Sequence, residues 1–229
     1  MKGKSKTLKK APARDFVARL KRLDCCAISD ALDRLHLRGV VVGLAPLTSK
    51  RCLAGRVLTV KLGVGEPPAG KPRHIGTTAI ESAQPGDIIV VEQRSGMPAA
   101  AWGGILSRGA KQRRIAGVIA EGPARDLDEA RDLDFPVFAR GATPVTARGR
   151  IVELANNVPV TIGEIEVRPG DYAIADASGV AFIAAENIER VLATAEEIAR
   201  REAAMIKSLR KGTPISEVMG ANYESMLKS

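Results

Sequence analysis

The middle of the chain alternates short apolar runs with amphipathic segments, and this alternation restricts the possible folds more than any other feature. The runs 87–92 (DIIVVE) and 117–121 (GVIAE) have the composition of buried strands, and a third strand is expected at 136–139. The segments 104–114 and 127–132 between them are predicted to be helices. Parallel strands need such a crossover helix between them. The sequence therefore predicts parallel strands at the centre of the fold.

The segments on either side predict antiparallel strands and further helices. Apolar residues spaced three and four apart indicate a helix from Ala13, a second helix is expected at 29–35, and 52–62 resembles a half-buried strand. Short alternating runs between 150 and 184 are typical of an antiparallel β-meander, and 186–209 has the composition of a long helix. We expect an α/β fold in which a mixed sheet has a parallel centre, a β-meander and flanking helices.

No linker divides the sequence, and we expect a single domain over residues 13–211. Residues 1–12 are predicted to be a disordered basic tail, and residues 212–229 a loosely held C-terminal tail. Of the net charge of +9, five charges come from lysines among the first ten residues, which leaves +4 elsewhere. A solvated arm explains this leader more simply than a polyanion-binding site, and aromatic residues, at 3%, are too few for RNA recognition by base stacking. Nucleic acid is therefore not an expected partner.

Composition also restricts the protein class and the compartment. The 229 residues are 45% hydrophobic and 27% charged, which is ordinary for a globular protein with a buried core. No apolar run approaches the ~18 residues of a membrane span, and the N-terminus lacks the apolar core of a signal peptide, so we expect a cytoplasmic protein. Cys25, Cys26 and Cys52 suggest neither a disulfide framework nor a CxxC metal pair, and we expect them to be reduced.

Two loops are candidate ligand sites, because each joins a parallel strand to the next helix at the edge where open α/β sheets bind ligands. In the first, 95–106, Gly103 and Gly104 precede a helix whose first N–H groups can bind a carboxylate or phosphate, although a tight turn also explains them. In the second, 121–130, Asp126 is either a helix N-cap beside a solvated Arg125, or a ligand for a divalent cation beside an arginine that binds a carboxylate. The pattern leaves both interpretations open.

Other reactive side chains have weaker sequence contexts. His36 follows a helix and is expected at the surface or in a cap, whereas His74 follows a Gly/Pro-rich loop at 63–71 that could be a mobile flap and bring it near the site. Lys61 and Lys111 have no context that would activate an amine, so Schiff-base chemistry is not expected. The single tryptophan, Trp102, is expected either to form a wall of the pocket or to pack in the core.

The sequence contains an ordered series of motifs: SDALDR (29–34), AGRVLTV (54–60), PGDIIVVE, WGGIL, GVIAEGPARD and DASGVAFIA, followed by a helix rich in Glu and Arg. This series resembles the family of 4-hydroxy-4-methyl-2-oxoglutarate and 4-carboxy-4-hydroxy-2-oxoadipate aldolases, which includes the regulator of ribonuclease E activity A. The match runs from about residue 13 to residue 211. The resemblance implies a β/β/α swivelling-type fold and a homotrimer or hexamer with sites near subunit interfaces.

The resemblance to the aldolase branch also implies roles for individual residues. It assigns the pyruvyl carboxylate to the backbone amides of Gly103, Gly104, Ile105 and Leu106. It assigns substrate binding to Arg125 and the metal, Mg²⁺ or Mn²⁺ or another divalent cation, to Asp126. An acidic residue on the C-terminal helix of a neighbouring subunit completes the family's site, and Glu202 is the matching position. Glu202 stands beside two arginines, which a solvated surface charge would explain equally well.

Two positions depart from the family pattern. Glu121 stands where the DGxxRD motif begins with aspartate. Gly104 stands where many aldolases carry an acid, which predicts weaker base assistance to aldol cleavage and less harm to decarboxylation. The ribonuclease-regulator branch usually lacks the metal-binding aspartate that this chain keeps as Asp126, and this difference favours an enzyme.

The combined features predict a divalent-metal-dependent lyase acting on a small 2-oxo acid. It would cleave 4-hydroxy-2-oxo acids to pyruvate, or decarboxylate oxaloacetate, through a pyruvate enolate whose charge the cation stabilises as a Lewis acid. Arg125 would add a fixed positive charge at the keto oxygen. The alternative is a non-catalytic regulatory binding protein of the ribonuclease E regulator type, with the basic tail as an arm near RNA.

Overall fold

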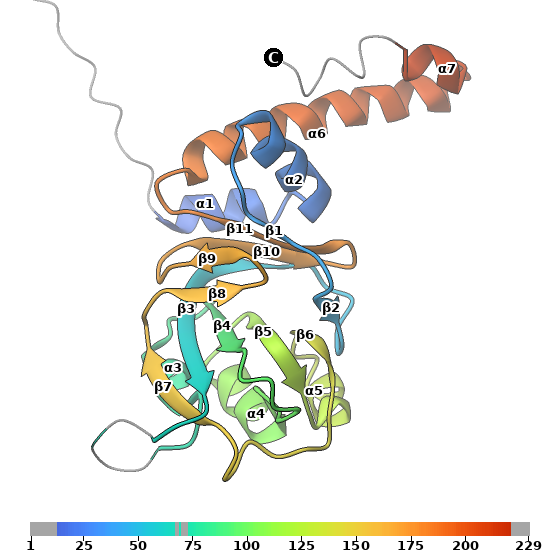
Figure 1. Cartoon of the computed structure of the whole chain (residues 1–229). Coiled ribbons are helices and arrows are strands. Elements are labelled where there is room, and N and C mark those ends of the chain that lie inside the picture. The colour runs from blue at the N-terminus through green and yellow to red at the C-terminus, as the bar shows by residue number, and fades with distance from the viewer. Residues whose placement is uncertain (1–12, 67–68, 70–72, 221–229) are drawn as a thin grey trace, which may run out of the picture.

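One long strand, β3 (Leu53–Gly63), joins the two halves of the main sheet in the computed structural model, which describes residues 13–66, 69 and 73–220 (Figure 1). The first half of β3 pairs antiparallel with β10 (Tyr172–Asp176), and its second half pairs in parallel with β4 (Ile88–Gln93). The end of β3 also pairs antiparallel with β7 (Val152–Asn156). The antiparallel and parallel halves of the sheet therefore share one strand.

The strand order confirms the predicted mixed sheet with a parallel centre. From one edge to the other, the sheet runs β1 (Val40–Val41), β11 (Gly179–Ile183), β10, β3, β4, β5 (Gly117–Ala124), β6 (Val137–Ala142) and β2 (Ala45–Pro46). The three central pairs from β3 to β6 are parallel, and the other pairs along this order are antiparallel. Two of the crossover helices, between β4 and β5 and between β5 and β6, are the ones that the sequence predicts, whereas the helix at Thr77–Ser82 in the crossover from β3 to β4 was not predicted.

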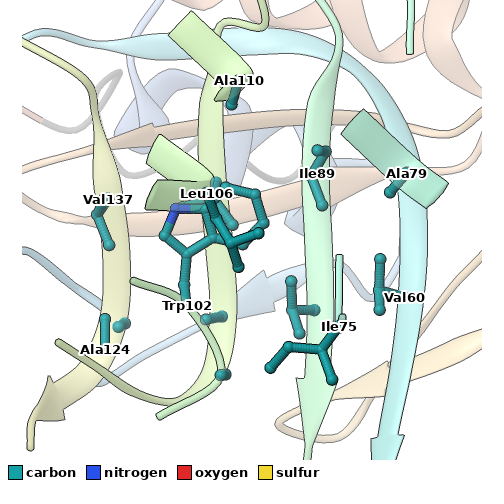
Figure 2. Close-up of a cluster of buried hydrophobic side chains, with 14 of the residues drawn as sticks. Val60, Ile75, Ala79, Ile89, Trp102, Leu106, Ala110, Ala124 and Val137 are labelled. Atoms are coloured by element: carbon teal, nitrogen blue, oxygen red, sulfur yellow. The ribbon is translucent and has the colours of Figure 1, made fainter. Parts of the chain in front are cut away.

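The parallel half is covered on both faces, which explains its continuous apolar strands. Ile89 and Val91 of β4 belong to a core cluster with the helices α3 (Thr77–Ser82), α4 (Gly104–Gln112) and α5 (Leu127–Asp132). Figure 2 shows part of this cluster, with Ala79 of α3 and Leu106 of α4 near the strands. Ile88 and Val90 belong to a second cluster that includes the hairpin of β8 (Val160–Ile162) and β9 (Ile165–Val167).

The antiparallel half is covered by helices from both ends of the described chain. The helices α1 (Ala13–Leu20), α2 (Cys25–Arg34) and α6 (Ile188–Arg210) lie together above β10 and β11 in Figure 1. The ring of Phe16 in α1 meets Tyr172 of β10 edge to face, with ring centroids 6.1 Å apart. Arg19 donates two hydrogen bonds to Glu196 of α6, at 2.7 and 2.8 Å, and so ties the first helix to the last long one.

The structure corrects two details of the sequence analysis. The second helix begins at Cys25 rather than at Ser29, because Asp24 is its N-cap and accepts the N–H of Ala27 at 2.8 Å. The strands between 150 and 184 are antiparallel as predicted, but they do not form one continuous meander. β7 pairs with β3, β8 and β9 form a separate two-stranded sheet, and β10 and β11 join the main sheet. Local turns create the hairpins, whereas contacts with distant strands decide where each hairpin docks.

Both predicted tails lie partly or wholly outside the described residues. Residues 1–12 and 221–229 are not described, and neither are residues 67–68 and 70–72 in and beside the loop expected to be a flap at 63–71. The described part of the C-terminal tail contains one short helix, α7 (Ile215–Val218). Within residues 13–66, 69 and 73–220, none of the helices combines the length and apolarity that crossing a membrane requires.

Candidate functional site

Backbone hydrogen bonds hold the two candidate loops together at the carboxyl ends of β4 and β5. The N–H of Ala101 donates to the oxygen of Pro123 at 2.8 Å, and the N–H of Arg125 donates to the oxygen of Trp102 at 3.0 Å. Trp102 and Ala124 form an isolated parallel bridge. The first loop thus runs beside the end of β5 like a short extra strand, and this brings the start of α4 next to the Arg125–Asp126 pair.

Asp126 has the position of an N-cap residue but not the bonding of one. Its backbone is in the left-handed region, with a φ of 55°, and its side chain makes no capping hydrogen bond to α5. Its Oδ2 atom instead accepts the N–H of Gly104 at 3.0 Å and the Nε–H of Arg125 at 3.1 Å. Of the two interpretations left open by the sequence, the structure excludes a capping role within α5. The carboxylate of Asp126 instead binds the first residue of α4, Gly104.

The glycines at the start of α4 are explained by close packing rather than by a tight turn. Gly103 has extended backbone angles, but a Cβ there would lie 3.1 Å from Oδ2 of Asp126. A Cβ on Gly104 would lie 3.0 Å from Cβ of Asp126 and inside contact distance of Oε2 of Glu129. The absence of side chains at both positions lets the starts of α4 and α5 meet.

A cavity of about 110 Å³ lies at this junction. Its wall contains every residue that the resemblance assigns to substrate or metal binding within the two loops: Gly103, Gly104, Ile105, Leu106, Arg125 and Asp126. His74, which the sequence analysis considered only as a weaker candidate, also lines the cavity, together with Arg148, which the sequence analysis did not single out. Asp126 is the only carboxylate among the described lining residues, against two arginines. The wall favours an anionic ligand.

Trp102 has both of the roles considered for it. Its side chain lines the cavity and is only 1% exposed. The indole Nε1–H donates to Oγ of Ser107 at 3.0 Å, and the ring stacks on Phe135 at a centroid distance of 6.5 Å. In Figure 2, Trp102 lies close to Leu106 inside the core cluster. The cavity therefore rests on a rigid, buried base.

Comparison with known proteins identifies the family to which the chain belongs. Residues 25–182 match the family described as Aldolase/RraA, which is more than half of the chain. The chain belongs to the Aldolase/RraA family. The matched segment includes both loops and all the cavity residues named above.

This Aldolase/RraA protein is similar to a named sequence relative and to two solved structures. A protein of Halalkalibacterium halodurans named "Putative 4-hydroxy-4-methyl-2-oxoglutarate aldolase" is 32% identical over 184 residues, which cover 80% of this chain and 83% of the relative. The crystal structure of an uncharacterized protein from Pseudomonas syringae pv. tomato aligns with a TM-score of 0.82 at 25% identity, covering 93% of this chain and 100% of that one. RraAS2 of Streptomyces coelicolor, described as an unusual member of the RNase ES inhibitor RraA family, aligns with a TM-score of 0.72 at 25% identity, covering 86% and 98%.

Glu121, where this Aldolase/RraA protein departs from the motif, forms part of an ion pair. Its carboxylate bonds to Arg140 at 2.9 Å and accepts the N–H of Gly163 at 2.9 Å. Gly163 lies in the turn between β8 and β9, so Glu121 ties this hairpin to the middle of β5. The side chain is not part of the cavity wall.

The other reactive groups of this family member lie away from the cavity. Lys61 pairs with Glu92 at 3.5 Å, and Lys111 donates to the backbone oxygen of Asp134 at 3.1 Å. His36 lies just after α2 and is not buried. Among the described residues, no lysine lines the cavity.

The three cysteines are free thiols, as the sequence predicts. Cys25 is buried, and its Sγ–H donates to the backbone oxygens of Ile174 and Gly179, at 3.4 and 3.2 Å. Burial raises the pKa of Cys25 and also that of Cys52. The position of Cys25 fits a structural role.

Glu202 is the one predicted site residue that the single chain does not bring to the cavity. It lies on α6, which packs on α2 in the antiparallel half, whereas α4 lies at the opposite end of the molecule in Figure 1. Partial burial raises the pKa of Glu202, and the neighbouring Asp24 and Asp30 raise it further. Glu202 can therefore reach such a cavity only in a second copy of the protein.

Proposed function

We propose that the protein is a divalent-metal-dependent lyase that cleaves 4-hydroxy-2-oxo acids to pyruvate, or decarboxylates oxaloacetate, through a pyruvate enolate. One observation carries the proposal: the Arg125–Asp126 pair and the start of α4 surround the same small cavity. The family and the aldolase name of the Halalkalibacterium relative support the reaction class.

The start of α4 supplies the group that would orient the substrate. The first N–H groups of a helix have no partner within the helix. Asp126 accepts that of Gly104, whereas the N–H groups of Ile105 and Leu106 have no hydrogen-bond partner among the described residues. These two donors suit the carboxylate of a 2-oxo acid. Arg125 would then hold a positive charge near the oxygen on which enolate charge develops.

The donor set at the cavity fits Mg²⁺ or Mn²⁺ better than Zn²⁺. The described residues contain no cluster of three His, Cys, Asp or Glu side chains that could enclose a metal. Mg²⁺ instead often uses one or two carboxylates and fills its remaining positions with water and substrate oxygens. Asp126 provides such a carboxylate, since its Oδ1 atom accepts no hydrogen bond from the described residues. A bound divalent cation would supply Lewis-acid stabilisation of the enolate.

The proposal includes a homo-oligomer, trimeric or hexameric, in which Glu202 of one copy approaches the cavity of another. Ile105 indicates that a neighbouring copy covers the cavity, because this apolar side chain lines the cavity and is 87% exposed in the single chain. Ile206 and Leu209 near the end of α6 are also exposed, at 49% and 37%. Apolar side chains at both places suit contact with a neighbouring copy.

The first test measures pyruvate release from oxaloacetate and from 4-hydroxy-4-methyl-2-oxoglutarate with Mg²⁺, against Mg²⁺ alone. We expect activity above that background, loss in EDTA, and loss in Asp126→Asn with an unchanged melting temperature. The control is Asp132→Asn, which removes an exposed acid at the other end of α5. Activity that survives EDTA, together with a borohydride-trapped adduct, would show that the reaction uses a lysine instead.

A regulatory role is the second candidate, and the similarity to RraAS2 of Streptomyces coelicolor favours it. A non-catalytic regulator of an RNA-processing enzyme would need neither Asp126 nor a divalent cation for its effect. Purified protein that releases no pyruvate but inhibits a ribonuclease E-type enzyme, equally well as wild type and as Asp126→Asn, would favour this candidate over the lyase.

A further inference from the structure

Glu129 occupies the space above the first residue of α4. It lies in the first turn of α5, three residues after Asp126. Any side chain at position 104 would collide with it, since a Cβ on Gly104 would lie 2.8 Å from Cδ of Glu129 and closer still to Oε2. Gly104 itself lines the cavity. The Glu129 carboxylate therefore stands where an acidic side chain at position 104 would be.

Glu129 also differs from the two neighbouring acids in its contacts. Asp126 accepts hydrogen bonds from Gly104 and Arg125, and Asp128 pairs with Arg131 at 2.5 Å. The carboxylate of Glu129, by contrast, has no hydrogen bond or ion pair with any described residue, and the residue is exposed. This carboxylate is thus free to exchange protons with solvent and with a bound molecule.

The proposed aldol cleavage needs a group that accepts the proton of the substrate's hydroxyl group. Within one chain, the residues assigned so far do not supply such a group. Arg125 is a permanent cation. Asp126 already accepts two hydrogen bonds and is the proposed cation ligand. Two candidates lie near the cavity: His74, which lines its wall, and Glu129, which lies against Gly104 and lines the adjoining hollow together with Arg125 and Asp126. Of these, Glu129 is the one in contact with the carboxylate-binding segment.

We propose that Glu129 is the general base for aldol cleavage, an inference that rests on the proposed lyase function. Glu129 accepts the proton of the C4 hydroxyl group while the C3–C4 bond breaks. The electron pair of that bond moves to C3 and the 2-oxo group, which forms the pyruvate enolate, and C4 becomes a carbonyl carbon. Return of the proton from Glu129 to C3 gives pyruvate and restores the carboxylate. Decarboxylation of oxaloacetate has no hydroxyl proton to remove and does not need Glu129.

The proposal predicts that Glu129→Gln separates the two reactions. General-base catalysis contributes about 10²-fold or more, so kcat for cleavage of 4-hydroxy-4-methyl-2-oxoglutarate should fall by at least about 10². Oxaloacetate decarboxylation by the same preparation should stay within about twofold, and so should the Mn²⁺ dissociation constant measured by electron paramagnetic resonance. The matched control, Asp128→Asn, removes an acid from the same helical turn and should change neither reaction.

Other outcomes would overturn the assignment. Equal loss of both reactions, no loss of either, or weaker Mn²⁺ binding by Glu129→Gln would each exclude a role specific to aldol cleavage. A selective loss in His74→Gln with none in Glu129→Gln would identify the histidine as the base. If the wild-type protein catalyses neither reaction, the proposed function fails before Glu129 is tested.

A rescue variant tests whether a carboxylate on residue 104 can replace that of Glu129, since the two would occupy the same space. Glu129→Ala should lose aldol cleavage, and the added change Gly104→Asp would place a new carboxylate in the volume that Glu129 vacates. We expect the double variant to recover at least about tenfold over Glu129→Ala, a small part of what a placed base supplies. A folded double variant that binds Mn²⁺ normally but recovers nothing would contradict the role proposed for this position.

Discussion

The two halves of the sheet differ in how their strands are connected. In the parallel half, each strand ends in a loop that leads to a helix or a long connection, and these loops carry Arg125, Asp126 and the cavity. In the antiparallel half, β10 and β11 are joined by a short turn and covered by three helices. Crossover connections leave unpaired N–H groups at helix starts, whereas a tight hairpin pairs its own backbone. The topology therefore places the proposed ligand site in the parallel half and leaves the antiparallel half to packing.

The largest expected effect on stability tests this division in the antiparallel half. Leu192 of α6 is fully buried in the cluster of α1, α2 and α6 with β10 and β11. Leu192→Ala should lower the free energy of unfolding by about 2–5 kcal/mol because it leaves a cavity. The kcat of the folded fraction should not change. Chemical denaturation and pyruvate release measured on the same samples would check both statements.

Leu106→Ala is the corresponding variant in the parallel half. Leu106 is 6% exposed, packs in the core cluster and lines the cavity. It should lose both stability and kcat, since its side chain packs in the core beneath the proposed carboxylate site and forms part of the cavity wall. If the two leucine variants show the same pattern, the division between a packing half and a binding half is wrong.

Arg125→Lys should reduce kcat/KM by about 10²-fold, or about 2.7 kcal/mol, because an ammonium cannot replace the planar guanidinium fork. The melting temperature should change little, since Arg125 pairs only with its neighbour Asp126 at 3.1 Å among the described residues. Arg140→Lys is the matched control, because Arg140 pairs with Glu121 outside the cavity wall. Arg140→Lys should keep the wild-type kcat/KM. If it loses as much as Arg125→Lys, the Arg125–Asp126 pair has no specific role in the reaction.

The smallest expected effect on stability concerns Glu202. Burial, then Asp24 and Asp30, raise its pKa in the folded chain. A carboxyl group with a raised pKa stabilises the fold below its unfolded pKa, and this contribution is lost as the pH rises through the folded value. At neutral pH, Glu202→Gln should therefore unfold at a temperature no lower than wild type, as differential scanning calorimetry would measure.

Activity measurements would show whether Glu202, in the antiparallel half of one copy, contributes to the cavity in the parallel half of another copy. Under the proposed function, Glu202→Gln is inactive, yet partial activity returns when it is refolded together with Asp126→Asn, since some mixed interfaces contain one intact site. Full activity of Glu202→Gln alone would restrict the site to the parallel half of a single chain, without affecting the role of Asp126.

Much of the site could be predicted because it depends on local sequence. The buried runs at β4 and β5 indicated parallel strands, and the loops after them were expected at the ligand-binding edge. Arg148 was missed although β6 is parallel to β5, because only two of the loops at that edge were considered. The signal was present in the alternation itself, since the connection after a third parallel strand returns to the same edge.

The sequence by itself determined the parallel centre, the helix starts at Gly104 and Leu127, and the pairing of a glycine loop with Arg125 and Asp126. These features depend on periodicity and turn chemistry, which act over a few residues. Only the tertiary structure decided that Asp126 binds the N–H of Gly104 instead of capping α5, that the β8–β9 hairpin stands apart, and that Glu129 fills the space above Gly104. Each of these depends on contacts between residues more than twenty positions apart, whose geometry no local pattern encodes.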